Sequence, residues 1–279
     1  MSKRGVLNGC FLSRGSFALL CCVVGFSVGA GEVRFEETTT VLPTYAPGGY
    51  DKTPIFYTGR VYQGAQGRVY PYPMQDVLHD EKADETYKYL VLENEWLQMG
   101  LLPEHGGHML NFTDRKSGFE IFYRQHVVKP ALIGMLGAWL SGGVEWNFPH
   151  HHRATTAMPI DWRMTERDPA EPSDFAPAAG TKTVWIGETE LRRRLKWTIG
   201  LSMMPDRAVL MAENIFMNRG PFIESMIYWA NVSVHCGDDY QILFPPSCHL
   251  GFDHHKNYWT SFPIGPRKEE VELLPSQRS

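Results

Sequence analysis

The sequence predicts an all-β protein built from antiparallel sheets, and three observations carry that prediction. Aromatic residues make up 13% of the 279 residues, and 19 prolines and 26 glycines punctuate the chain, which is typical of many short strands joined by turns. Runs of alternating apolar and polar residues recur between these turns. There is no long amphipathic helical pattern, no strand-helix alternation and no solenoid-length repeat, which excludes Rossmann, barrel and solenoid architectures.

Residues 1–30 have the pattern of a secretory signal peptide. Three basic residues precede the apolar stretch Phe17 to Val28, and the small residues Gly29 and Ala30 fit cleavage after Ala30. A stretch of about a dozen apolar residues is too short to span a bilayer, which favours a signal over an uncleaved anchor. We therefore expect a secreted or periplasmic protein.

Residues 31–84 are predicted to form an extended leader that lies against the following domain. They are rich in Thr, Pro, Gly and Tyr, with Val33 to Glu36 as a first strand and Tyr57 to Tyr72 as further extended pieces. The charged run Asp80 to Glu85 predicts a break before the domain begins.

Residues 85–265 carry the strand signals of a β-sandwich domain. The hairpin turns are Gly106-Gly107 and Asp114 to Gly118, and the segment Val127 to Leu140 predicts a loop with a short helical turn. Asp168 to Gly180 predicts a loop, and residues 266–279 a charged tail. The predicted strands are Tyr87–Glu93, Trp96–Leu102, His108–Phe112, Phe119–Tyr123, Thr181–Glu188, Leu191–Leu201, Ala208–Met217 and Ile223–Val234.

The charge of the mature chain disfavours two classes of partner. Removal of residues 1–30 leaves 24 basic against 31 acidic residues, a net charge of −7. We therefore expect no nucleic-acid partner and no membrane partner beyond export. Cys236 and Cys248 remain, and the compartment permits either one disulfide or two free thiols.

The segment Gly142 to Arg153 carries the strongest indication of a binding site. A glycine pair lets the backbone approach a ligand, and a carboxylate, an indole, an amide and imidazoles follow, which suit a hydroxyl-rich ring. The alternative is structural, because the same residues also form tight turns, cores and solvated loops. The predicted substrate-binding residues are Gly142, Gly143, Trp146, Asn147, Arg153 and Trp162.

Glu145 is the strongest single candidate for acid or base chemistry. Its apolar and aromatic neighbours would raise the pKa of a buried carboxyl, although a structural role within its own loop is the alternative. Glycoside cleavage needs a second carboxylate, for which the candidates are Glu104, Asp161 and Glu213. Neighbouring histidines on a strand face opposite ways and rarely share an ion, so we predict no metal site and no cofactor.

Two groups of residues resemble a known superfamily. The segment Leu102 to Leu110 with Asp114, Gly118 and Glu120 resembles the opening strands of aldose 1-epimerase and other galactose-mutarotase-like proteins. The run Lys129 to Pro149 is similar to an uncharacterised bacterial domain of that superfamily, often found ahead of tetratricopeptide repeats. Tyr228–Asn231 and Phe244–Pro246 add to that similarity, which covers roughly Tyr87 to Trp259.

The resemblance implies an antiparallel β-supersandwich with a carbohydrate cleft on its concave side, and tetratricopeptide repeats in longer relatives. The epimerases use a histidine as acid and a late glutamate as base. His150, His151 and His152 are the nearest counterparts of the acid, and with Glu145 they make up the predicted catalytic set. The late glutamate and the strands expected after Trp259 have no counterpart, so the chain resembles a member shortened at its C-terminal end.

Three functional hypotheses follow from the resemblance. The first is an exported carbohydrate-binding domain, which the missing late glutamate favours over catalysis. The second is a carbohydrate-active enzyme, an aldose epimerase or a glycoside-cleaving enzyme, with Glu145 and one of the three histidines as acid and base. The third is a structural or interaction module whose cleft is vestigial. A second carboxylate beside Glu145 would favour the enzyme.

Overall fold

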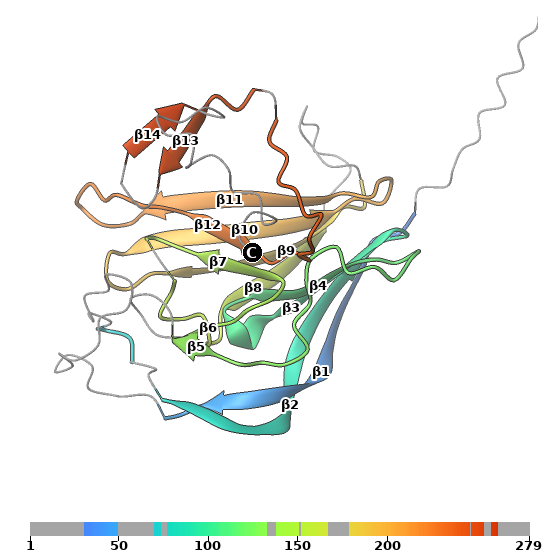
Figure 1. Cartoon of the computed structure of the whole chain (residues 1–279), viewed down its shortest axis with the longest axis horizontal. Helices are drawn as coiled ribbons and strands as arrows, with labels where there is room; N and C mark the ends of the chain where they lie inside the picture. Colours follow the sequence, from blue (N-terminus) through green and yellow to red (C-terminus); the bar gives the residue numbers. More distant parts are fainter. Residues whose placement is uncertain are drawn as a thin grey trace, which may run out of the picture. The chain divides into compact units, whose positions relative to one another are not determined.

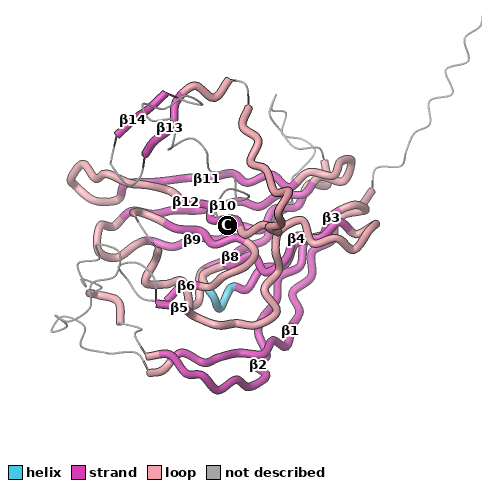
Figure 2. The backbone as a smooth tube through the Cα atoms, viewed as in Figure 1, coloured by secondary structure: helices cyan, strands magenta, loops and turns pink. Residues whose placement is uncertain are grey.

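The computed structural model describes residues 31–49, 70–73, 77–132, 138–150, 152–166, 179–245, 247–253 and 258–261. The chain divides into two units, Met1–Ala30 and Gly31–Ser279, and every described residue belongs to the second. The predicted signal peptide and the tail 266–279 lie outside the described residues. Strands dominate the described part, which contains one short 3₁₀ helix, Pro103–His105 (Figure 2). No described helix is long and apolar enough to cross a membrane.

The larger sheet has six strands and brings distant parts of the sequence together (Figure 1). Its neighbours pair antiparallel, and β7 lies between β4 and β12, with Met109 opposite Val144 and Asn231 opposite Glu145. The strands in spatial order are β1 (Arg34–Pro47), β2 (Leu78–Glu93), β3 (Leu97–Leu102), β4 (His108–Asp114), β7 (Val144–Asn147) and β12 (Trp229–Val232).

The second sheet has four antiparallel strands, which follow one another along the chain as a meander. In spatial order they are β11 (Leu210–Asn218), β10 (Leu195–Met203), β9 (Lys182–Thr189) and β8 (Asp161–Glu166). Two small two-stranded sheets complete the described fold: β5 (Ala131–Leu132) with β6 (Ala138–Trp139), and β13 (Leu250–Asp253) with β14 (Tyr258–Ser261).

One hydrophobic core joins the two large sheets. Leu90 and Leu92 of β2 belong to the same buried cluster as Ile199 and Leu201 of β10, and all four are fully buried. Alternate residues of each strand supply this cluster because successive side chains of a strand point to opposite faces. The fold is therefore an antiparallel all-β sandwich, which confirms the predicted fold class.

The predicted break at Asp80 to Glu85 is wrong. These residues lie within the continuous strand β2, which pairs with β1 from Arg34 opposite Glu93 to Pro47 opposite Leu78. The first part of the predicted leader is therefore an edge strand of the sheet. Charged residues fit this strand because residues 78–86 of β2 are exposed, whereas the paired part of β1 buries Leu42 and Thr44.

Several predicted strands are longer than the strands that the structure contains. Of the segment 119–123, only Glu120 makes a β-bridge, to Thr113, and of 223–234 only Trp229–Val232 is a strand. The segment 127–140 contains β5 and β6 in its described part. Strands β7 and β8 were not predicted, because four or six residues with glycine or proline nearby give too short an alternation to recognise.

Candidate functional site

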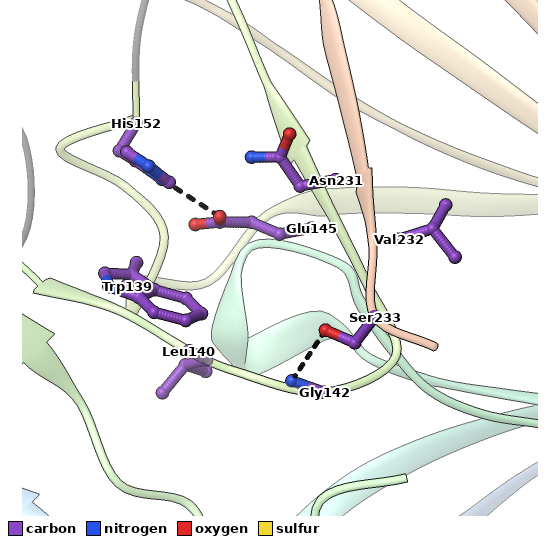
Figure 3. A pocket seen from close by; sticks show the side chains of 8 residues that line it. All are labelled: Trp139, Leu140, Gly142, Glu145, His152, Asn231, Val232 and Ser233. Atoms are coloured by element: carbon purple, nitrogen blue, oxygen red, sulfur yellow. Dashed lines mark hydrogen bonds and ion pairs between the residues drawn. The ribbon is translucent and has the colours of Figure 1, made fainter. Parts of the chain in front are cut away.

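A pocket of about 310 Å³ opens where β7 and β12 meet the β6 strand and the loop that follows β7 (Figure 3). The volume is at the lower end of the range for small-molecule sites, which suits a single ring. The lining residues combine one large aromatic ring with polar groups of four kinds. They are Trp139, Leu140, Gly142, Glu145, His152, Asn231, Val232 and Ser233.

Strand alternation places Glu145 in this pocket. Val144 and Trp146 point into the core, so Glu145 and Asn147 project from the opposite face of β7. Asn231 of β12 stands directly opposite Glu145 in the antiparallel register and also lines the pocket. Pairs opposite each other in such a register have neighbouring side chains, so the amide and the carboxylate share one wall.

Three donors hold the Glu145 carboxylate, which is only 3% exposed. Asn147 Nδ2 donates to Oε2 over 3.0 Å, and His152 Nδ1 lies 3.0 Å from the same oxygen. Thr156 Oγ1 donates to Oε1 over 3.1 Å. Buried carboxylates require such partners, and together they fix the carboxylate in one orientation at the pocket wall.

The pKa of Glu145 lies below its ordinary value, whereas the sequence predicted a raised one. Burial by itself raises the pKa, but the hydrogen bond and charge of His152, the amide of Asn147 and the charge of His108 outweigh it. The sequence pattern identified the apolar surroundings correctly but carried no information about these partners. Glu145 is therefore an anion near neutral pH.

A buried histidine lies behind the carboxylate. Burial lowers the pKa of His108 to about 4, while the charge of Glu145 and a hydrogen bond to the backbone of Gly142 oppose that shift. His108 is therefore neutral near pH 7. Its Nδ1 has no hydrogen-bond partner. His105 is buried beside the ring of Tyr87, and burial lowers its pKa to about 4 as well.

The glycine pair sets the pocket floor by a close approach of two backbone segments. Gly143 has a φ of 52°, and a Cβ there would lie 1.7 Å from the Met109 carbonyl oxygen. Gly142, at a φ of 86°, lines the pocket and donates its N–H to Ser233 Oγ over 3.2 Å. The pair therefore brings β7 against β4, and only Gly142 borders the pocket.

A family model described as "Domain of unknown function (DUF5107)" matches residues 65–267. The chain belongs to this family. The matched range contains every described residue that lines the pocket.

A solved structure of a TPR-domain containing protein from Parabacteroides distasonis ATCC 8503 is similar to this chain, with a TM-score of 0.62 and 23% identity. The similarity covers 74% of this chain and 33% of that one, so this chain matches about a third of its length. At this identity the likeness shows the fold alone. It agrees with the expectation of a domain that accompanies tetratricopeptide repeats in longer proteins.

Of the predicted catalytic residues, the DUF5107 pocket brings together Glu145 and His152. His150 does not line it, and the charges of Arg192, Arg193 and Glu224 act on its ring instead. His151 lies outside the described residues. The described pair therefore consists of one carboxylate and one imidazole, joined by a direct contact.

Several predicted substrate-binding residues do not line this pocket. Trp146 is 5% exposed, and its Nε1 donates to the Gly107 carbonyl over 3.1 Å from the core face of β7. Trp162 packs against Phe35 and the core from β8, away from the pocket. Asn147 supports Glu145 from behind without lining the pocket.

Arg153 is buried and faces away from the pocket. Its guanidinium donates to the carbonyls of Trp146 and Gly106, pairs with Glu188 over 2.9 Å, and lies 4.6 Å from the Trp197 ring centroid. Arg153 thereby fixes the loop that carries His152, which makes it a positioning residue.

The candidate second carboxylates do not reach Glu145. Glu104 accepts a hydrogen bond from the Lys88 backbone, and Asp161 and Glu213 belong to the second sheet. Among the described residues, Glu145 is the one acidic residue that lines the pocket, and no group of three His, Cys, Asp or Glu is placed to hold a metal. Cys236 and Cys248 are both free thiols.

Sequence reasoning missed the second half of the pocket wall. Asn231, Val232 and Ser233 follow one another on and after β12, within 90 residues of Glu145. The only available signal was the short motif Tyr228–Asn231, since strand pairing over such a separation leaves no local pattern. Trp139 was one of several aromatic residues in the segment, and nothing in the spacing distinguished it from Trp146.

Proposed function

We propose that this domain binds a sugar ring in the pocket between β6, β7 and β12. The observation that carries the proposal is the arrangement of the indole of Trp139 beside the polar groups of Glu145 and Asn231 (Figure 3). A sugar has C–H-rich faces that pack on an aromatic ring and hydroxyls that need both donors and acceptors. The pocket offers an aromatic ring, hydrogen-bond donors and hydrogen-bond acceptors within a volume that suits a single ring.

The carboxylate retains capacity for a ligand hydroxyl. An ionised carboxylate accepts at about four lone-pair positions, and the protein donors fill three of them at Glu145. Asn231 adds an amide with both a donor and an acceptor, and Ser233 adds a hydroxyl. A hydroxyl-rich ligand therefore finds complementary partners without any rearrangement of the buried network.

The geometry supports binding rather than epimerisation. Epimerisation needs an acid and a base on separate sides of the anomeric centre, because one proton leaves the hydroxyl while another reaches the ring oxygen. Glu145 and His152 are 3.0 Å apart and contact each other, so they present one side to a ligand. Glycoside cleavage needs two carboxylates, and only Glu145 lines the described pocket.

Two further proposals accompany this function. We propose kinship with the galactose-mutarotase-like superfamily, which the motifs from Leu102 to Leu110 and from Gly142 to Pro149 support. We also propose export, which the pattern of residues 1–30 supports. An exported sugar-binding domain would meet its ligand outside the cytoplasm.

The proposal is tested by titration calorimetry of the protein with a panel of monosaccharides and oligosaccharides. We expect at least one member to bind with 1:1 stoichiometry. Trp139→Ala should weaken that binding about 10-fold to 100-fold, the range for loss of an aromatic anchor. Trp259→Ala is the matched control, because it removes an indole that is 70% exposed on β14 and does not line the pocket.

Circular dichroism establishes that both variants are folded before titration. Failure of the unsubstituted protein to bind any sugar of the panel would count against the proposed function. Equal affinities for the unsubstituted protein and Trp139→Ala would move the sugar site away from this pocket.

A further inference from the structure

The pocket contains few ionisable groups, and one of them is a carboxylate. Glu145 and His152 are its ionisable lining residues, and no lysine or arginine is among the described residues that line it. His152 Nδ1 lies 3.0 Å from a carboxylate oxygen of Glu145, so the two ionisable groups contact each other directly. The pocket wall therefore carries one carboxylate, and the described residues that line it add no lysine or arginine.

Neighbouring groups do not offset this charge. Arg153 follows His152 in the sequence, but its guanidinium is 3% exposed at the side chain, faces the Trp197 ring and pairs with Glu188. His108, behind Glu145, is neutral because burial lowers its pKa to about 4. Asn147 and Thr156 hold the carboxylate as an anion by donating to it.

We infer that the pocket selects uncharged sugars and excludes uronic acids. This inference rests on the proposed function and specifies its ligand class. A uronic acid carries a carboxylate in place of a neutral hydroxymethyl group, and within this small pocket that charge would lie close to Glu145. Repulsion between like charges at such distances in a partly desolvated site lowers the affinity by more than about tenfold. A site can reject a ligand of similar shape in this way.

The test compares ligands that differ only in this group, by calorimetry at pH 7. The probes are glucose with glucuronate and galactose with galacturonate, and the neutral methyl ester of each uronate is the control for size. We expect the neutral sugar to bind at least tenfold more tightly than its uronate, and the methyl ester to recover most of that loss. The ester comparison separates charge from steric exclusion without any substitution in the protein.

Two variants test whether the charge of Glu145 causes the preference for neutral sugars. Glu145→Gln keeps the shape and removes the charge, so its preference for the neutral sugar should fall to less than threefold. Asn231→Asp adds a second anion at a half-buried position opposite Glu145, so its preference should rise further, at least threefold above the unsubstituted protein. The second variant leaves the Glu145 network intact and remains decisive if Glu145→Gln does not fold.

The outcomes separate this inference from the proposed function. If the protein binds neither the neutral sugars nor the uronates, both the proposed function and the charge selection are contradicted. Binding of the neutral sugar and its uronate with equal affinity, or a tighter uronate, overturns the charge selection while the sugar site stands. An unchanged preference in a folded Glu145→Gln, or in Asn231→Asp, also overturns it. A poorly binding methyl ester would attribute the discrimination to size and overturn it as well.

Discussion

Replacing Arg153 by alanine should destabilise the domain more than any exposed arginine does. The side chain is 3% exposed and donates to the carbonyls of Trp146 and Gly106 over 2.7 Å each, and to Glu188 over 2.9 Å. Its loss leaves Glu188, which is 16% exposed at its side chain, without this partner and leaves two buried carbonyls without these donors. Breaking one side of a buried pair costs about 3–5 kcal/mol, so we expect a loss of that size.

The measurement is urea unfolding followed by far-ultraviolet circular dichroism, with thermal unfolding in parallel. For a domain of this size, a loss of about 3–5 kcal/mol corresponds to a melting temperature lower by about 6–20 °C. The control is Arg207→Ala, which removes an exposed pair with Asp206 and should leave the stability almost unchanged. The double variant Arg153→Ala with Glu188→Gln should recover part of the loss, because the unpaired charge is gone.

The result that would refute this reasoning is a folded Arg153→Ala within about 1 kcal/mol of the unsubstituted protein. In that case the guanidinium would not fix the loop that carries His152. A loss confined to sugar affinity, with stability unchanged, would instead place Arg153 in the binding site, as the sequence had suggested.

Four further predictions follow from the same structure. Gly143→Ala should destabilise the domain by several kcal/mol more than Gly118→Ala in urea unfolding. Both glycines have positive φ, but a Cβ at Gly143 would lie 1.7 Å from the Met109 carbonyl oxygen, whereas nothing lies within 4 Å of one at Gly118; equal losses would contradict the close approach. Stability should fall as the pH drops from about 6.5 to about 4, because unfolded His108 takes up a proton that the folded, neutral ring with a pKa of about 4 does not, and His108→Asn should flatten that fall in acid unfolding curves; an unaltered pH profile would contradict it. N-terminal sequencing of exported material should begin at about Gly31, and an intact start in the cytosol would remove the export proposal. Polarimetry of freshly dissolved α-glucose or α-galactose should show no acceleration of mutarotation by the protein, whereas a rate proportional to its concentration and abolished by Glu145→Gln would promote the enzyme hypothesis.

The fold class was predictable because it depends on patterns that local sequence records. Alternation and turn residues located the central strands, such as Trp96–Leu102 against the observed Leu97–Leu102. The charged run Asp80 to Glu85 misled, because composition alone does not show that an exposed strand is paired with a neighbour. A break and an exposed strand have the same charged sequence, and only pairing with β1 distinguishes them.

The candidate site was predictable in part. Glu145 and His152 were identified because they lie in one segment with a glycine pair, and the structure brings both to the pocket. Trp146 was predicted because β7 was not recognised as a strand, and only in a strand do adjacent residues such as Glu145 and Trp146 point to opposite faces. Asn231 was missed because its position opposite Glu145 depends on pairing between β7 and β12, which no local pattern encodes.

The central claim is that a sugar ring binds in the pocket beside Trp139, and a crystal structure of the domain with a sugar from the binding panel tests it most directly. We expect the ring to lie against the Trp139 indole, with a hydroxyl within hydrogen-bond distance of Glu145 or Asn231. A well-ordered sugar elsewhere, for example on the outer face of the four-stranded sheet near Trp185 with this pocket empty, would contradict the account.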